Sequence, residues 1–205
     1  MRLEGEDKEG VIGAVEFIEE LRMKHHKLVV PKRVVVIGGG NTAMDAASES
    51  ARMGARKTVL TYRNSKDNMG AYGFEYDLAI SAGVDSLFNV TPIAIVGNGK
   101  VEGVKFAKTE MIDGNLQTNM KNVFVVRCDL VIKATGQAKQ GHLYDLIDNL
   151  DAGNNAIIKV NDETFQTSNP KYFAGGDAIN GGSEVVNAAY DGKMAAQGIH
   201  SWLNK

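Results

Sequence analysis

The chain has 205 residues, with 43% hydrophobic and 23% charged residues, which suits one large globular domain or two small ones. A formal net charge of −2 gives no basic footprint for nucleic acid or an anionic membrane, and no apolar run approaches the ~18 residues of a membrane span. Its one cysteine, Cys128, excludes an internal disulfide and a cysteine-rich metal site, so we expect no metal and a cytoplasmic location.

The first half of the sequence alternates helices and strands. Apolar residues at helical spacing from Val11 to Leu21, with charged residues between them, predict an amphipathic helix. A strand over 33–37, a helix over about 41–53, a strand over 58–62 and a helix over about 71–82 follow. This order predicts a βαβ unit with parallel strands.

The second half begins with a different pattern. Asn-Gly at 98–99 and Asp-Gly at 113–114 are hairpin-turn dipeptides between β-rich segments, so we expect an antiparallel meander over about 86–126. The remaining expected elements are a return strand over 129–134, a helix over 141–150, a short buried strand over 172–175 and a closing helix over 184–203.

Residues 34–45, VVVIGGGNTAMD, place three glycines between an apolar strand and an alanine-rich helix. Positions 38–43 have the spacing G-x-G-x-x-A, which allows a tight turn, a close approach of the backbone to a pyrophosphate and close packing of helix on strand. Asn41 or Thr42 is expected to cap the helix and contact phosphate. A purely structural turn is the weaker alternative. The predicted nucleotide-binding residues are Gly38, Gly39, Gly40, Asn41, Thr42 and Ala43.

The second strand predicts which nucleotide binds. An NAD or FAD site usually has an acidic residue ~20 positions on, which binds the ribose 2′-hydroxyl. Positions 50–66 contain no Asp or Glu, and Arg63 and Lys66 stand where a 2′-phosphate would be bound. The sequence therefore predicts NADPH rather than NADH. The alternative is that both cations are ordinary surface charges.

A second glycine-rich turn lies near the end of the chain. In the stretch PKYFAGGDAINGGSEVVNAAY, a strand leads into Gly176 and Asp177, and a long helix follows from about residue 184. A carboxylate in this place can accept hydrogen bonds from sugar hydroxyls, and the helix N-terminus can offer N–H groups to a ligand. From the residues alone, this is a polar turn of some ligand site.

Six ordered segments cover nearly the whole chain: GVIGAVEFIEELR, VVVIGGGNTAMDAA, YRNSKDNMGAYGFEYDLAISAGV, DLVIKATGQ, FAGGD and DGKMAAQGI. Together they resemble the flavin and pyridine-nucleotide disulfide-reductase superfamily, and within it the small chain of glutamate synthase and the NADPH/FAD half of dihydropyrimidine dehydrogenase. The resemblance implies a hydride transfer from NADPH to FAD, after which electrons pass to an iron–sulfur or partner domain. It implies no catalytic side chain, because the cofactors carry the chemistry.

The resemblance also implies an α/β fold with a domain order. Residues 1–31 would be a linker and helix connected to an FAD-binding domain. Residues 32–133 would form a Rossmann-like NADPH-binding domain, with a parallel sheet plus an antiparallel meander. Residues 134–205 would be the C-terminal part of the FAD-binding domain. The implied FAD-side residues are Thr135 and Gly136 at the return to that domain, Gly176 and Asp177 near the ribityl and phosphate region, and Glu184 and Val185 near the isoalloxazine.

The sequence departs from the family pattern in three ways. Asn64 stands where the family often has a second arginine, no G-x-G-x-x-G precedes Val11, and no cysteine-rich iron–sulfur segment is present. We therefore expect a fragment with an incomplete FAD site, whose partner is the missing N-terminal FAD/iron–sulfur segment or another subunit, and whose apolar face favours self-association.

Two other classes of function stay open. One is a stand-alone NADPH-binding module without turnover. The other is a flavin-free Rossmann dehydrogenase, which the sequence supports weakly. Short-chain enzymes of that kind need Tyr-x-x-x-Lys, whereas Tyr190 and Lys193 have the spacing Tyr-x-x-Lys.

Overall fold

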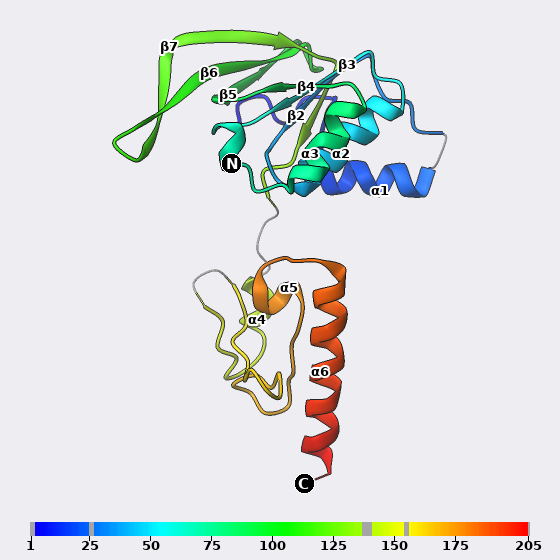
Figure 1. The fold of residues 1–205 in the computed structure, drawn as a ribbon, viewed down its shortest axis with the longest axis vertical. Coiled ribbons are helices and arrows are strands. Elements are labelled where there is room, and N and C mark those ends of the chain that lie inside the picture. The colour runs from blue at the N-terminus through cyan, green and yellow to red at the C-terminus, as the bar shows by residue number, and fades with distance from the viewer. Residues whose placement is uncertain (1–2, 25–26, 137–140, 154–155, 205) are drawn as a thin grey trace. The chain divides into compact units, whose positions relative to one another are not determined.

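A computed structural model describes residues 3–24, 27–136, 141–153 and 156–204, and the chain divides into two compact units, Met1–Gly136 and Gln137–Lys205 (Figure 1). The first unit contains β1 (Val11–Gly13), α1 (Ala14–Lys24), β2 (Arg33–Ile37), α2 (Asn41–Arg52), β3 (Lys57–Thr61), a 3₁₀ turn (Lys66–Asn68), α3 (Gly73–Ser81), β4 (Val84–Leu87), β5 (Val90–Val96), β6 (Gly103–Ile112), β7 (Asn115–Arg127) and β8 (Leu130–Lys133). The second contains α4 (Gly141–Tyr144), α5 (Asp177–Asn180) and α6 (Val185–Leu203).

The centre of the first unit is a five-stranded sheet with the order β1-β8-β2-β3-β4, and all its pairs are parallel. The predicted βαβ unit and its parallel strands are therefore confirmed. Strand β2 lies in the middle, and its residues from Val34 to Ile37 are all buried. A near-continuous apolar strand is typical of a parallel sheet that is covered on both faces.

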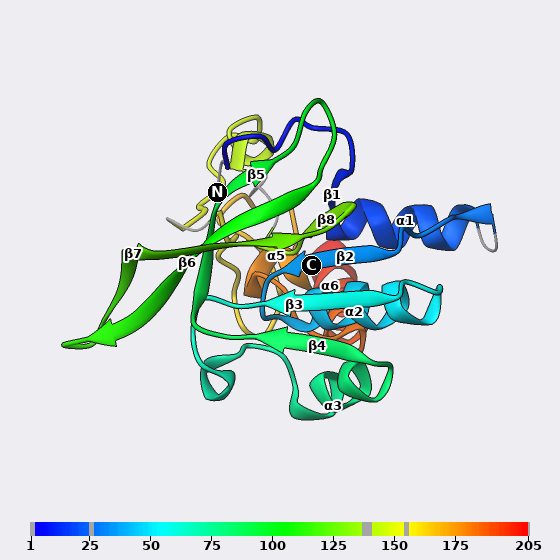
Figure 2. The same cartoon turned by 90° about the horizontal axis from the view of Figure 1, so that it is seen from above.

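The alternating side chains of β2 divide the first unit into two cores. Val34 and Val36 pack with the helices α1, α2 and α3, whereas Val35 and Ile37 pack with the antiparallel strands on the opposite face. The unit thus has three layers: helices, the parallel sheet and the antiparallel sheet (Figures 1 and 2). The mixed α/β fold class predicted from the sequence is confirmed.

The antiparallel layer is a meander of β5, β6 and β7, as expected. The Asp113–Gly114 turn joins β6 to β7 with both residues at positive φ, 50° and 76°, which is the geometry that selects this dipeptide. The expected start of the meander at residue 86 is wrong. Residues Val84–Leu87 form β4, which pairs with β3 in the parallel sheet, and the meander begins at Val90.

The N-terminal segment differs from the prediction. Residues Val11–Gly13 form strand β1, which pairs with β8, and the helix begins only at Ala14. Val11–Gly13 forms hydrogen bonds with the open side of β8, and this pairing stabilises a strand although Val11 has the spacing of the helix. The segment before β1 also joins the two sheets, because the amide of Ile95 donates to the carbonyl of Glu4 at 2.8 Å. Residues from Leu3 to Lys24 thus pack within the first unit, whereas their predicted link to an FAD-binding domain stays a prediction.

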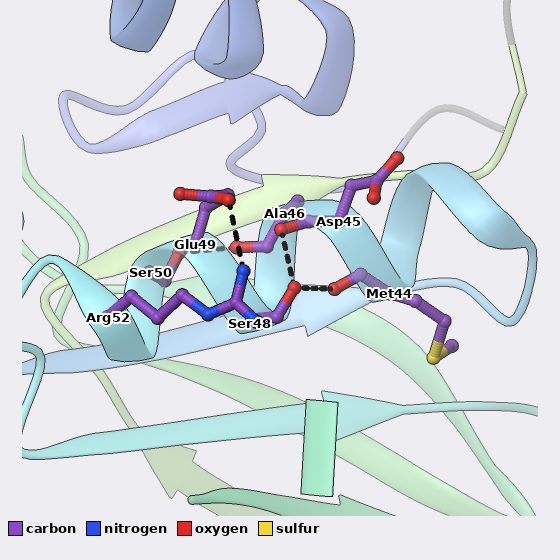
Figure 3. A network of polar contacts seen from close by, with 7 residues as sticks. All are labelled: Met44, Asp45, Ala46, Ser48, Glu49, Ser50 and Arg52. Atoms are coloured by element: carbon purple, nitrogen blue, oxygen red, sulfur yellow. Dashed lines mark hydrogen bonds and ion pairs between the residues drawn. The ribbon is translucent and has the colours of Figure 1, made fainter. Parts of the chain in front are cut away.

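Helix α2 lies close to the sheet because its inner face consists of small residues, with Ala43, Ala46 and Ala47 fully buried. Two buried serines satisfy their hydroxyls within the helix (Figure 3). Ser48 Oγ donates to the carbonyl of Met44 at 2.8 Å, and Ser50 Oγ donates to the carbonyl of Ala46 at 2.6 Å. The helix therefore buries polar side chains without leaving these donors unpaired.

The second unit confirms the closing helix and corrects two other predictions. The helix expected over 141–150 ends at Tyr144, and the strand expected over 172–175 is reduced to one bridge, between Gln166 and Phe173. Among the described residues of this unit, strand pairing is limited to isolated bridges. A sequence with strand character forms a ladder only where a neighbouring strand supplies the hydrogen bonds. No helix in the described ranges is long and apolar enough to cross a membrane.

Candidate nucleotide-binding site

The glycine turn of residues 38–40 joins β2 to α2 at the carboxyl ends of the central parallel strands. Gly38 has a φ of 152°, and a β carbon on it would lie 2.4 Å from the carbonyl oxygen of Ala134 in the strand-to-loop turn after β8. Its amide donates to the carbonyl of Thr61 at 3.0 Å. Only glycine fits here, which agrees with the tight-turn role predicted for the first glycine of the motif.

A pocket of about 360 Å³ opens over this turn. Its walls come from the ends of β2, β3 and β8 and from the start of β5. The lining residues are Ile37, Gly38, Gly39, Gly40, Thr61, Tyr62, Arg63, Gly70, Val90, Thr91, Pro92, Ala134 and Thr135. Arg63 is the one charged residue in this lining, so the pocket favours an anion.

The loop after β3 folds back onto the glycine turn. The ring of Tyr62 lies against Gly39, and its hydroxyl donates to the carbonyl of Asn68 at 2.9 Å. The amide of Ala71 donates to the carbonyl of Gly39 at 3.0 Å, and the amide of Tyr72 donates to Asn41 Oδ1 at 2.9 Å. The loop is therefore fixed directly over the turn at both of its ends.

These contacts correct the expected helix cap. The N-cap of α2 is Gly40, and no side chain caps the helix there. Asn41 Oδ1 accepts instead from the loop at Tyr72, and Thr42 is exposed. In the first turn of α2 the amide of Ala43 already donates to the carbonyl of Gly40 at 2.9 Å. The amides of Asn41 and Thr42 precede this first hydrogen bond of the helix, so they are available to an anion at this end. Ala43 is fully buried, in accord with its predicted packing role.

The two predicted 2′-phosphate cations have different surroundings. Arg63 is exposed at the pocket, and within the described residues its guanidinium has no hydrogen-bond or ion-pair partner. Lys66 does not line the pocket; its Nζ lies 4.4 Å from the centre of the Tyr76 ring, as in a cation–π contact. Both assignments stay predictions, and Lys66 has a competing partner.

Thr135 and Gly136, predicted on the FAD side, lie at the end of the first unit. Thr135 lines the same pocket as the three glycines. Gly136 follows with a φ of 96° and does not line the pocket.

The four remaining predicted residues meet in the second unit. Gly176, Asp177, Glu184 and Val185 line one open pocket of about 500 Å³. Gly176 has a φ of 63°, and its amide donates to Asp191 Oδ2 at 2.9 Å, so α6 holds this turn in place. The sequence analysis gave Asp191 no role, although it is the first residue of the segment DGKMAAQGI, because its contact with the Gly176 turn depends on how α6 packs.

Two neighbouring titratable groups in the first unit, Cys128 and Asp129, have clearly shifted pKa values. Hydrogen bonds from Arg33, including one from its Nε at 3.0 Å, hold the pKa of Asp129 below its ordinary value. Burial raises the pKa of the Cys128 thiol to about 12, which is typical of an inert structural cysteine. Within the described ranges, no group of three or more His, Cys, Asp or Glu residues is suited to a metal ion.

Comparison with known families identifies the chain. Residues 1–192 match the family described as pyridine nucleotide-disulphide oxidoreductase. The chain belongs to this family. The resemblance drawn from the six sequence segments is therefore confirmed.

Relatives within this oxidoreductase family include complex subunits. The chain is 36% identical to the glutamate synthase [NADPH] small chain of Escherichia coli, over 98% of this chain and 47% of that protein. It is 34% identical to the NADP(+)-dependent formate dehydrogenase subunit beta of Moorella thermoacetica, over 100% of this chain and 30% of that protein. The chain spans less than half the length of these relatives.

Solved structures of this fold agree. A thioredoxin reductase from T. acidophilum matches with a TM-score of 0.78 at 22% identity, over 99% of this chain and 62% of the other. FprA from Mycobacterium tuberculosis in complex with NADPH matches with a TM-score of 0.69 at 16% identity, over 100% of this chain and 61% of the other. At these identities the likeness establishes the fold.

Proposed function

We propose that this chain is the NADPH-binding portion of a flavin-dependent oxidoreductase that resembles the glutamate synthase small chain. The observation that carries the proposal is the pocket of the first unit, which is lined by the glycine turn that leads into α2 and by one charged residue, Arg63. Backbone amides at a helix start and a single guanidinium suit a dinucleotide with a 2′-phosphate.

Each part of this pocket has a distinct role in the proposal. The backbone at Gly38 to Gly40 approaches the pyrophosphate, and the first turn of α2 directs its amides toward it. Arg63 binds the 2′-phosphate, with Lys66 as a second cation. Thr135, which follows β8, lines the same pocket. Bound NADPH would supply a hydride, and FAD would accept it and provide the electrons for an iron–sulfur or partner domain. The protein side chains bind and orient.

The second unit supplies part of the proposed FAD site. Gly176, Asp177, Glu184 and Val185 surround one open pocket, and the amides at the start of α6 have no acceptor within that helix. Val185 and Val186 are 80% and 70% exposed, an unusual state for paired valines on a structured helix. We infer that a segment of a longer protein, or a partner subunit, completes this site and covers these residues. The isolated chain would then retain FAD weakly and self-associate through the same surface.

A stand-alone NADPH-binding module is the alternative. It is favoured by one observation: every residue that lines the first pocket comes from the unit Met1–Gly136. Flavin uptake on addition of the N-terminal half of a relative would argue against this alternative. We propose the cytoplasm as the location, because the one cysteine is a free thiol.

The experiment is titration of the chain with NADPH and with NADH by calorimetry, together with an absorbance spectrum of the same sample. Tight NADPH, weaker NADH and no flavin band are expected. Equal affinity for the two nucleotides would contradict the NADPH assignment. A stoichiometric flavin band would contradict the incomplete FAD site.

A further inference from the structure

The loop that carries Arg63 is braced by the antiparallel sheet. Thr109 of β6 is 5% exposed, and its hydroxyl donates to the carbonyl of Arg63 at 2.6 Å. The amide of Thr109 donates to the carbonyl of Asn89 at 2.9 Å, and the amide of Asn89 donates to the carbonyl of Asn64 at 3.2 Å. These three hydrogen bonds join β6, the residue before β5 and the loop after β3 into one closed arrangement.

Arg63 needs such a brace because the parallel sheet no longer holds it. Strand β3 ends at Thr61, and the β3–β4 ladder stops at the same residue. Tyr62 is still held by its amide and carbonyl, which bond Leu87 at 3.0 Å and Val90 at 3.1 Å. Among the described residues, the carbonyl of Arg63 accepts its hydrogen bond from the hydroxyl of Thr109.

The brace matters because the pocket has one cation. The Arg63 guanidinium is exposed and joined to the backbone by a flexible stem, so the direction of its peptide sets the region that the guanidinium can reach. The other nearby cation, Lys66, lies over Tyr76 outside the lining. A rotation of the Arg63 peptide would therefore move the one guanidinium that lines the pocket and weaken 2′-phosphate binding.

We propose that Thr109 is a positioning residue for nucleotide selectivity: its buried hydroxyl fixes the Arg63 peptide so that the guanidinium faces the 2′-phosphate. The inference rests on the proposed NADPH site. It gives the antiparallel sheet a role in binding, since Thr109 lies on that sheet, 46 positions after Arg63, and sets the geometry of the loop that carries Arg63.

The test compares NADPH and NADH affinities of the full 205-residue chain carrying Thr109→Val, which removes the hydroxyl and keeps the branched shape. A neutral hydrogen bond is worth ~1 kcal/mol, so the NADPH-to-NADH affinity ratio is expected to fall about fivefold, with NADH affinity unchanged. Thr109→Ser keeps the donor and should restore the ratio. Thr118→Val is the matched control, because Thr118 is the exposed partner of Thr109 on β7.

If Thr109→Val does not fold, Thr109→Ala and Thr109→Ser differ by the same hydroxyl and replace it in the comparison. Equal loss of both nucleotides would mean that the hydroxyl acts only in folding, and an unchanged ratio would also overturn the inference. Arg63→Met separates the two proposals. If Arg63→Met lowers the ratio but removal of the Thr109 hydroxyl does not, only the positioning role fails. If wild type has no preference for NADPH, the proposed nucleotide fails, and the positioning role with it.

Discussion

The ring of Tyr62 lies directly over Gly39, so that a β carbon added to Gly39 would come within 2.4 Å of Tyr62 Cδ2. Gly40, the next residue, has open space at the same place and a φ of −100°, which any residue adopts. Two neighbouring glycines of one motif thus have different reasons to be glycine. Gly39 leaves space for the Tyr62 ring, whereas the space beside Gly40 is open to a ligand.

This difference predicts that alanine at Gly39 affects stability, whereas alanine at Gly40 affects NADPH binding. Gly39→Ala displaces Tyr62 and should lower the free energy of unfolding by about 1–3 kcal/mol, as overpacking does. Gly40→Ala should leave stability unchanged but weaken NADPH binding by at least about tenfold, because the new methyl lies where the pyrophosphate approaches. Urea unfolding and nucleotide titration of both variants check this. Normal NADPH affinity in Gly40→Ala would contradict the predicted placement of the pyrophosphate.

Strand β3 offers a matched pair of buried threonines. Thr58 Oγ1 is buried and has no hydrogen-bond partner among the described residues, whereas Thr61 Oγ1 donates to the carbonyl of Val36 at 3.0 Å. Thr58→Val is therefore expected to be neutral or to stabilise by up to about 1 kcal/mol, because it removes an unpaired buried hydroxyl. Thr61→Val should destabilise by about 1–2 kcal/mol, because it leaves a carbonyl without that donor. Urea unfolding midpoints measure both, and equal losses would contradict the difference in pairing.

Helix α6 carries a second matched pair, in the other unit. A β carbon on Gly198 would lie 2.0 Å from the carbonyl oxygen of Thr164, whereas Gly192 has nothing within 4 Å. Gly198→Ala should destabilise this unit by about 1–3 kcal/mol, and Gly192→Ala should stabilise the helix by about 0.5–1 kcal/mol.

The single tryptophan reports on this unit. Trp202 lies on α6 with its ring centre 6.5 Å from that of Phe173, so its fluorescence follows the docking of the helix. Urea unfolding followed by this signal should place the two alanine variants on opposite sides of wild type. Identical midpoints would mean that α6 does not pack against residue 164 in solution.

The Arg33–Asp129 pair predicts a pH dependence. Hydrogen bonding from Arg33 lowers the pKa of Asp129 below its ordinary 3.8 in the folded protein. A carboxyl with a depressed folded pKa stabilises above its unfolded pKa and loses that effect as the pH falls through the folded value. Asp129→Asn should therefore lower the unfolding midpoint at pH 7, and its difference from wild type should shrink below pH 3.8.

The control for this prediction is Asp85→Asn. Asp85 approaches Lys57 only to 3.9 Å, and both side chains are more than 60% exposed, so this pair should contribute little at any pH. If Asp129→Asn and Asp85→Asn have the same pH profile, the Arg33 contact does not stabilise the fold.

The elements that the sequence predicted correctly are those whose signal is local. The strand with Val34 to Ile37, the glycine turn, the alanine-rich helix and the Asp113–Gly114 hairpin all follow from residue periodicity and turn chemistry. The wrong predictions concern segments whose state depends on a distant partner. Val11–Gly13 becomes a strand because it pairs with the open edge of β8. Val84–Leu87 joins the parallel sheet because it pairs with the open edge of β3.

The sequence by itself determined the family, the glycine turn between strand and helix, and the absence of an acidic residue after the second strand, because each is a pattern of neighbouring residue types. The tertiary structure decided what those residues contact. It gave Asn41 to the loop at Tyr72 rather than to a helix cap, placed Lys66 over Tyr76, and set the hydroxyl of Thr109 on the peptide of Arg63. Each of these contacts joins residues from different segments of the chain, and only folding brings such partners within hydrogen-bonding or ring-contact distance.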